Sequence, residues 1–275
     1  MQIGTLKLDC PAVMGILNVT PDSFSDGGQF AARDDALREA DAMIAEGAAI
    51  LDIGGESTRP GAADVSVEEE LDRVIPVVEA LRKITDAPIS VDTSKVAVMC
   101  AAANAGADMI NDVRALREDG ALAAVAELDV AVCLMHMQGQ PRTMQREPSY
   151  HDVIAEVSEF LAERRDRCVD AGIDQQQIVL DPGFGFGKSH AHNVELLANL
   201  RQLADIGQPL LVGLSRKATL GQLTGREIDQ RLAASIAAAI VAVMNGAMIV
   251  RTHDVAETLD ALRVAQAVTA VGIMK

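Results

Sequence analysis

The chain has 275 residues, of which 49% are hydrophobic, and a net charge of −16 at pH 7. This composition is typical of a folded protein with a sizeable core and excludes an intrinsically disordered chain. So acidic a protein repels phosphate backbones and anionic lipids, which argues against nucleic acid and membrane surfaces as partners. The length suits one large α/β barrel, and no Pro-, Gly- or Ser-rich linker divides it. We therefore expect a single domain over residues 1–275.

The cysteines and the apolar segments indicate a cytoplasmic protein. Four scattered cysteines form no CxxC pair, and the first residues do not resemble a secretion leader. Residues 233–250 approach the length of a membrane span, but they are Ala-rich, and Asn245 and Gly246 provide the signals of a helix end. We expect a buried helix followed by a buried strand at this place.

In chain order, a short alternating segment at residues 2–8 precedes eight apolar runs of strand length. The runs cover residues 13–19, 50–53, 89–91, 109–110, 130–135, 178–180, 210–214 and 248–250. They are nearly continuous rather than alternating, which is typical of parallel strands buried on both faces. Residues 35–46, 67–83, 150–171 and 255–268 carry apolar residues at helical spacing. This order predicts a (β/α)8 TIM barrel with a short N-terminal β segment.

An open doubly wound sheet is the alternative fold, because it also alternates strands and helices. No GxGxxG motif follows the first run, however. The segment from Gly187 to Ser189 is similar to the end of a phosphate-binding P-loop, but Pro182 stands where that motif requires glycine.

Polar residues follow the apolar runs, and in a barrel all these strand ends lie on one rim. Helix capping accounts for some of them, such as Ser66 in capping-box spacing with Glu69, and Asp254. Capping does not account for Lys217 and Arg251, because cations are unfavourable at a helix N-terminus. We therefore predict a ligand site, which also includes Asn111.

The residue types indicate the kind of ligand. Asp92, Asn111, Asp181 and Lys217 supply acceptors and donors that suit the edge of a flat heterocycle such as a pterin or a purine. Arg251 and His253, with Asn18 across the rim, suit a phosphate or diphosphate. The alternative for Arg251 is an ion pair with Asp254 or Asp112. His136 is expected to orient its neighbours rather than to react.

Aromatic residues are scarce, with five Phe, one Tyr and no Trp. Phe24, Phe184 and Phe186 all fall in predicted rim loops, where they could form the walls of a site for a flat ligand, although Phe184 could instead plug the barrel mouth. The loops after the first two runs are long and rich in Gly, Ser, Pro and Asp, as is typical of mobile covers.

These motifs resemble those of the dihydropteroate synthase family along the whole chain. In order they are GILNVTPDSFSDGG (15–28), DIGGESTRPG (52–61), SVDT (90–93), IND (110–112), LMH (134–136), LDPGFGFGK (180–188), GLSRK (213–217) and VRTHD (250–254). The resemblance implies condensation of 6-hydroxymethyl-7,8-dihydropterin diphosphate with 4-aminobenzoate to give 7,8-dihydropteroate and diphosphate.

The resemblance also assigns roles to individual residues. It implies that Asp92, Asn111, Asp181 and Lys217 hold the pterin, and that Asn18, Arg251 and His253 take the diphosphate, with Mg2+ bound through Asn18. Thr58, Arg59, Pro60, Phe186 and Ser215 would shape the aminobenzoate pocket, and Phe24 and Asp26 would close over it. The implied catalytic residues are Asp26, Asp92, Asp181, Lys217 and Arg251, and the implied assembly is a homodimer.

Two other functions remain as alternatives. A methyltransferase that handles methyltetrahydrofolate shares the barrel and an Asp/Asn pterin site, but it has no use for the anion-binding set of Arg251 and His253. A non-enzymatic pterin-binding relative would be expected to have lost one of the first two loop motifs, and both are intact here.

Residues 181–188 follow the ordinary family pattern, whereas sulfonamide-resistant relatives look altered around Phe186.

Overall fold

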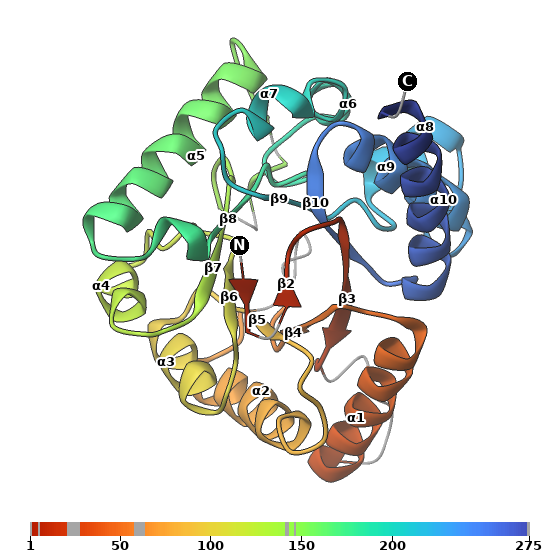
Figure 1. Cartoon of the computed structure of the whole chain (residues 1–275). Helices are drawn as coiled ribbons and strands as arrows, with labels where there is room; N and C mark the ends of the chain where they lie inside the picture. The colour runs from red at the N-terminus through yellow and green to blue at the C-terminus, as the bar shows by residue number, and fades with distance from the viewer. Residues whose placement is uncertain are drawn as a thin grey trace.

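A computed structural model describes residues 2–4, 6–20, 28–57, 64–140, 143–145 and 147–273 of the chain. In this part of the chain, eight parallel strands close into a barrel in the order β10-β3-β4-β5-β6-β7-β8-β9 (Figure 1). The strands are β3 (Ala12–Asn18), β4 (Ile50–Gly54), β5 (Ile89–Asp92), β6 (Met109–Asp112), β7 (Ala131–Met135), β8 (Ile178–Asp181), β9 (Leu210–Val212) and β10 (Ala247–Thr252). The predicted TIM barrel is confirmed, and each barrel strand overlaps one of the eight apolar runs.

Helices lie between the strands and form a ring around the barrel (Figure 1). They are α1 (Gly28–Glu46), α2 (Val67–Leu81), α3 (Val96–Asn104), α4 (Ala121–Ala126), α5 (Val153–Asp170), α6 (His190–Ala198), α7 (Leu200–Ala204), α8 (Ala218–Thr224), α9 (Leu232–Met244) and α10 (Val255–Ile273), with short 3-10 turns η2 (Gln175–Gln177) and η3 (Ile228–Gln230). The four helical patterns in the sequence correspond to α1, α2, α5 and α10. Helix α1 begins earlier than the predicted residue 35.

Local sequence signals explain two of the helix boundaries. Ser66 and Glu69 form the predicted capping box at the start of α2, each side chain bonding the backbone N–H of the other residue. At the other end of the fold, Gly246 adopts a left-handed φ of 103° between α9 and β10. The stretch 233–250 is therefore a helix followed by a strand, as predicted. No helix in the described ranges is both long and apolar enough to cross a membrane.

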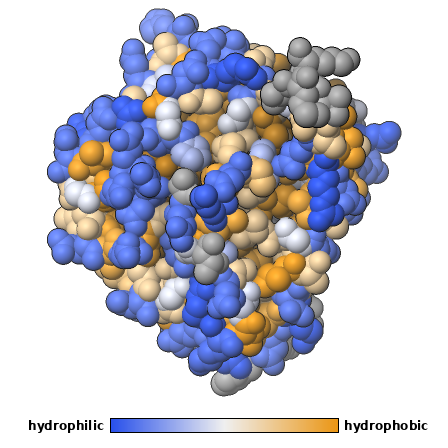
Figure 2. Space-filling model, viewed as in Figure 1, coloured by the Kyte–Doolittle hydropathy of each residue, from blue (hydrophilic) through white to orange (hydrophobic). Residues whose placement is uncertain are grey.

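A two-stranded antiparallel hairpin, β1 (Gln2–Ile3) and β2 (Leu6–Lys7), closes the amino end of the barrel. Figure 1 looks onto this end, with β1 and β2 in front of the barrel opening. Ile3 is fully buried and packs in one cluster with barrel residues that include Met14, Ile50 and Met109. The outer surface of the same end is mixed, with hydrophilic side chains along much of its margin (Figure 2).

Every second residue of a strand points into the barrel, because successive residues point to opposite faces. These inward side chains form two chemically different layers. Toward the amino end the interior is mostly apolar, with the buried Ser90 of β5 beside Met109; its apolar residues are Met14, Ile50, Met109, Ala131, Cys133, Val179, Leu211 and Ile249. Two residues further along β4, β6, β8 and β10 stand Asp52, Asn111, Asp181 and Arg251. The strands thus bring a polar layer together at the carboxyl end of the barrel.

Candidate active site

The polar layer is a hydrogen-bonded network centred on Arg251. Its guanidinium pairs with Asp52, with Nε 2.6 Å from Oδ2, and with Asp92, with a terminal nitrogen 3.0 Å from Oδ2. Asn111 donates from Nδ2 to the same Asp52 oxygen at 3.2 Å. Strand pairing fixes these positions, because Asp92 lies beside Asn111 in the β5–β6 register. Strands β4, β5, β6 and β10 therefore each contribute one side chain to this network.

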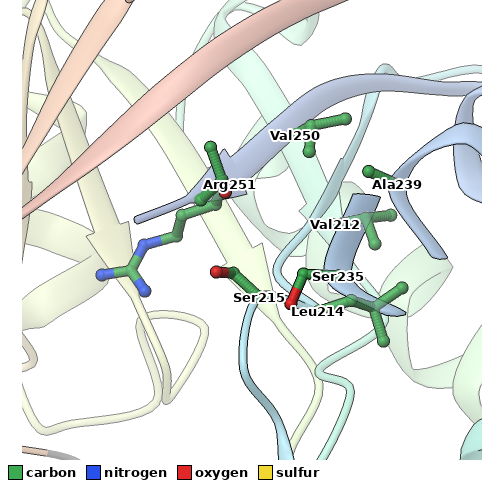
Figure 3. Close-up of a pocket in the computed structure, with 8 residues that line it drawn as sticks. Val212, Leu214, Ser215, Ser235, Ala239, Val250 and Arg251 are labelled. Carbon is green, nitrogen blue, oxygen red and sulfur yellow. The ribbon is translucent and has the colours of Figure 1, made fainter. Parts of the chain in front are cut away.

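The partners of Arg251 are not those considered in the sequence analysis, where an ion pair with Asp254 or Asp112 was the alternative to ligand binding. Neither Asp254 nor Asp112 is its partner: Asp254 pairs with Arg216 at 2.5 Å, on the outside of β10. Figure 3 shows the guanidinium of Arg251 directed away from Ser235 and Ala239. The guanidinium of Arg251 therefore points into the barrel, toward Asp52 and Asp92.

Burial and crowding of like charges change the proton affinities of this network. The pKa of Asp92 is raised to about 7: burial is the largest cause, Arg251 opposes it, and the nearby Asp52 adds a smaller upward contribution. Burial also raises the pKa of Asp181. For Arg251, burial lowers the pKa, but Asp52 and Asp92 outweigh burial, and the net shift is upward. The guanidinium is thus held as a permanent cation among carboxylates with weakened acidity.

Lys217 and Phe186 form the side of the site next to β8 and β9. The Lys217 ammonium donates to the carbonyl oxygen of Phe184 at 2.5 Å and lies 4.3 Å from the centre of the Phe186 ring. Burial lowers the pKa of Lys217 to about 8, although Asp181 favours the charged form. Phe184 is buried in the main core, so it is a plug and not a wall. Phe186 is half-buried and remains available as a wall.

Ser215 and His253 form a neighbouring pair at the ends of β9 and β10. The Ser215 hydroxyl lies 2.9 Å from Nδ1 of His253 and also accepts from the His253 backbone N–H at 3.3 Å. Sequence reasoning had assigned these two residues to different substrates, and the structure brings them into contact. Asn18 ends β3 beside Gly54 of β4, on the same rim.

Several predicted site residues cannot be placed, because they lie outside the described residues. They are Phe24 and Asp26 of the first loop and Thr58, Arg59 and Pro60 of the second.

The sequence reasoning missed three charged groups near the site, two of them buried and one, Lys95, partly buried. Asp52 is fully buried and bonds Arg251, yet it stands inside an apolar run rather than after it. Lys95 pairs with Glu56 and Glu70, which together outweigh burial and raise the pKa of Lys95. Lys188 is also buried, and its ammonium lies 2.8 Å from Nδ1 of His136. Alternation along each strand was the signal that could have identified Asp52.

Two cavities adjoin this network. A small one of about 10 Å³ lies between β9, β10 and α9 (Figure 3) and has room for about one water. A hollow of about 660 Å³ lies over the carboxyl ends of β4, β5 and β6, within the size range of small-molecule sites. Of the predicted site residues in the described ranges, only Asp92 lines this hollow.

A TIM barrel with carboxylates, an amide and cations at its carboxyl end has the features of an enzyme that binds a small polar heterocycle. The model of a family described as "Pterin binding enzyme" matches residues 14–253. The chain belongs to this family of pterin-binding enzymes.

Its relatives define the family more narrowly. The dihydropteroate synthase of Escherichia coli K12 is 56% identical, covering 96% of this chain and 93% of its own length. That of Haemophilus influenzae is 55% identical, with 95% of each chain covered. Within the pterin-binding enzymes, the chain thus belongs with the dihydropteroate synthases, as its motifs predicted.

Solved structures agree with this placement. A Yersinia pestis dihydropteroate synthase in a sulfonamide drug complex superposes with a TM-score of 0.92 at 54% identity, covering 96% of both chains. A Xanthomonas albilineans dihydropteroate synthase with 4-aminobenzoic acid gives a TM-score of 0.91 at 57% identity, covering 96% of this chain and 95% of that one. The same enzyme with 7,8-dihydropteroate gives 0.86 at 52% identity, with the same coverage.

Proposed function

We propose that the protein condenses 6-hydroxymethyl-7,8-dihydropterin diphosphate with 4-aminobenzoate, releasing diphosphate and forming 7,8-dihydropteroate. The observation that carries this proposal is the network at the barrel mouth in which Arg251 pairs with Asp52 and Asp92, and Asn111 donates to Asp52. Carboxylate acceptors there suit the N–H groups of a pterin edge, and the Lys217 ammonium suits its carbonyl or ring nitrogen. Structures of similar enzymes with 4-aminobenzoic acid and 7,8-dihydropteroate support the same substrates.

The reaction begins with loss of diphosphate from the pterin methylene group. Breaking this C–O bond places negative charge on the leaving group, which Arg251 and His253 are proposed to stabilise. The methylene group becomes cationic, and the carboxylates of Asp92 and Asp181 stabilise that charge electrostatically. The Arg251 guanidinium is suited to this role because its neighbours hold it charged.

The second step forms the C–N bond. The neutral aniline nitrogen of 4-aminobenzoate attacks the methylene cation and then loses a proton. No strong general base is required, because the electrophile is very reactive, so most of the catalysis is positioning. The proposed pocket for 4-aminobenzoate is formed by Phe186 and Ser215, together with Thr58, Arg59 and Pro60. Phe24 and Asp26 are proposed to close over it.

Mg2+ is the proposed cofactor, and Asn18 is the residue that would hold it. The residues present fit this ion in one way only. No group of three or more His, Cys, Asp or Glu side chains in the described part of the chain could form an all-protein metal site. A single amide oxygen suits Mg2+ when substrate phosphates and water complete the coordination, as is common for this ion. When bound, Mg2+ would neutralise charge on the departing diphosphate.

We also propose that the chain acts in the cytoplasm, as a single domain, and forms a homodimer. Support for a dimer comes from exposed apolar residues on the neighbouring helices α8, α9 and α10: Leu223, Leu232, Val241, Met244, Val264 and Val268. Large exposed apolar surfaces mark association sites. Sedimentation of the parent and of a Val241→Glu, Val264→Glu variant tests this. A parent that sediments as a monomer contradicts it.

The activity is tested by incubating the protein with both substrates and Mg2+ and measuring 7,8-dihydropteroate. Asp181→Asn is the matched variant, because it keeps the shape of the side chain but presents N–H donors toward the pterin. Buried donors without acceptors cost about 1–3 kcal/mol each, so pterin binding should be strongly weakened. We expect product from the parent and little from the variant. No product from the parent, or equal rates, contradicts the assignment.

A further inference from the structure

The loop between β8 and α6, residues 183–187, forms a backbone arch, here called the β8 arch. Gly183, Gly185 and Gly187 all have left-handed φ angles, of 69°, 79° and 61°. A Cβ atom on Gly183 would collide with the carbonyl oxygen of His136, and one on Gly187 with that of Gln138. The arch therefore lies directly on the backbone that follows β7, in a conformation that favours glycine at these positions.

Lys188 fills the inside of the β8 arch. Its ammonium lies 2.8 Å from Nδ1 of His136, 3.0 Å from the carbonyl oxygen of Gly183 and 3.1 Å from that of Phe186. The carbonyl oxygen of His136 is also within reach, at 3.3 Å. Lys188 is only 1% exposed, and burial lowers its pKa to about 7, so these acceptors take the place of water around its ammonium form. One side chain thus joins both halves of the arch to the end of β7.

His136 is built to accept this bond. Burial lowers its pKa to about 2, with a further contribution from Lys188, so the imidazole is neutral and its Nδ1 can accept from the ammonium. Its ring packs edge-on against Phe160, with centroids 4.9 Å apart. Tyr150, on the same side, donates its hydroxyl to the carbonyl oxygen of Gly187 at 2.8 Å. The acceptor is therefore held in a fixed orientation.

The β8 arch contacts two of the proposed substrate-binding residues, Asp181 and Lys217, and contains a third, Phe186. The Gly183 N–H donates to the Asp181 carboxylate at 2.7 Å, and Lys217 donates to the carbonyl oxygen of Phe184. Phe186, in the arch itself, lies under the Lys217 ammonium. Asp181 has independent support, because it belongs to β8 and its carbonyl oxygen accepts from the His136 N–H at 2.9 Å. Phe186 belongs to no strand: the arch sets the position of its backbone, while its ring also packs against a small cluster that includes Met135 and Met137.

We propose that Lys188 is a positioning residue, which acts through His136 and the arch carbonyls to hold Phe186 in place as one wall of the aminobenzoate pocket. This inference rests on the proposed function, since it concerns the specificity of the same site. It assigns a specificity role to a buried lysine that does not itself contact substrate. It also predicts an asymmetry: loss of the ammonium should disturb the aminobenzoate side much more than the pterin side.

The test is a comparison of KM values for the two substrates in Lys188→Met, which keeps the length of the side chain but removes its donors. We expect the KM for 4-aminobenzoate to rise by about tenfold or more, since small misplacements of binding groups act on this scale. The KM for the pterin diphosphate should stay within about twofold of the parent value. Equal rises in both KM values, or no rise in either, would overturn the proposal.

A matched control is Arg164→Met, which removes another buried cation bonded to loop carbonyls. Arg164 donates to the carbonyl oxygens of Ala115 and Leu116, in the loop after β6 and away from the β8 arch. It should leave the KM for 4-aminobenzoate within about twofold of the parent value, even if the protein is less stable. A tenfold rise in this control would show that any buried cation has the same effect, which contradicts a specific role for Lys188.

Two further measurements keep the inference testable. If Lys188→Met does not fold, His136→Leu should raise the KM for 4-aminobenzoate, whereas His136→Asn, which keeps an acceptor near the Nδ1 position, should not; equal effects overturn the proposal. If the parent forms no 7,8-dihydropteroate, the proposed function has failed, and hydrogen exchange decides the positioning role alone. Amides of residues 183–187 should then exchange faster than in the parent, in Lys188→Met or, if that variant does not fold, in His136→Leu. Amides of residues 50–54 should exchange at the parent rate. Unchanged exchange in the arch contradicts the inference.

Discussion

The two halves of the barrel interior are made by the same strands and have opposite chemistry. The amino half is mostly apolar, sealed by the β1–β2 hairpin through buried Ile3, and contains residues such as Leu211 and Ile249. The carboxyl half holds Arg251 between Asp52 and Asp92. Inward-facing residues only two positions apart on the same strand belong to different halves, as Ile249 and Arg251 do on β10. A strand therefore contributes one residue to the core and the next inward-facing residue to the polar layer. The comparison teaches that stability and function should be separable by mutation.

The largest expected effect comes from breaking a buried charge pair at the carboxyl end. Lys95 pairs with Glu56 and, at 2.5 Å, with Glu70, whose side chain is 1% exposed. Lys95→Met leaves this carboxylate buried without its cation, which costs on the order of 3–5 kcal/mol in the free energy of unfolding. Urea unfolding measures the loss. Adding Glu70→Gln should recover most of it, and a double variant no more stable than Lys95→Met contradicts the account.

A slightly smaller loss in the free energy of unfolding is expected from a cavity in the apolar half. Leu211→Ala removes a fully buried side chain from the barrel interior and should lower the free energy of unfolding by about 2–5 kcal/mol. Both KM values should stay close to those of the parent, because the variant leaves the polar layer intact. Ile84→Ala, at a 62% exposed position, is the control and should change stability by less than about 0.5 kcal/mol. A substrate-specific KM change in Leu211→Ala would contradict the separation of the halves.

The smallest expected effect is a gain of stability in the charged half. The pKa of Asp92 is raised to about 7, so between about pH 4 and pH 7 the folded protein keeps a proton on Asp92 that the unfolded chain has lost. This contribution makes the folded state less stable as pH rises through that window. Asp92→Asn removes this contribution, while Arg251 keeps its ion pair with Asp52, so the variant should be more stable than the parent by about 1–2 kcal/mol at pH 7.5 and by less at pH 5, with activity lost.

Urea unfolding of parent and variant at both pH values provides the measurement. Asp41→Asn, at an exposed carboxylate of α1, should show no such dependence on pH. A variant that loses stability at pH 7.5 would mean that Asp92 supports the fold and not only the site.

Much of this architecture could be predicted from the sequence. Near-continuous apolar runs identified all eight barrel strands, because parallel strands are buried on both faces. The same rule hid Asp52, since a charged residue inside a run was read as part of the strand and not as an inward-facing group of the site.

The bond between Lys188 and His136 was missed for a different reason, although His136 itself was expected to orient its neighbours. The bond from Lys188 to His136 joins residues 52 apart in the chain, and it forms only because glycines let the β8 arch lie against the end of β7. A pattern of neighbouring residues in the sequence cannot predict a contact between residues so far apart in the chain. The sequence predicted Arg251 as a site residue but not its ion pairs with Asp52 and Asp92, which stand on strands β4 and β5, far from it in sequence.

The most direct test of the central claim is calorimetric titration of Arg251→Ala with a pterin and with its diphosphate. If the carboxyl half binds the pterin through its carboxylates and the diphosphate through Arg251, affinity for the diphosphate should fall by about 2–5 kcal/mol. Affinity for the pterin alone should change much less. Arg251→Lys, which keeps the charge but not the planar fork, should lie between the parent and Arg251→Ala. Equal weakening of both ligands in Arg251→Ala would contradict the account.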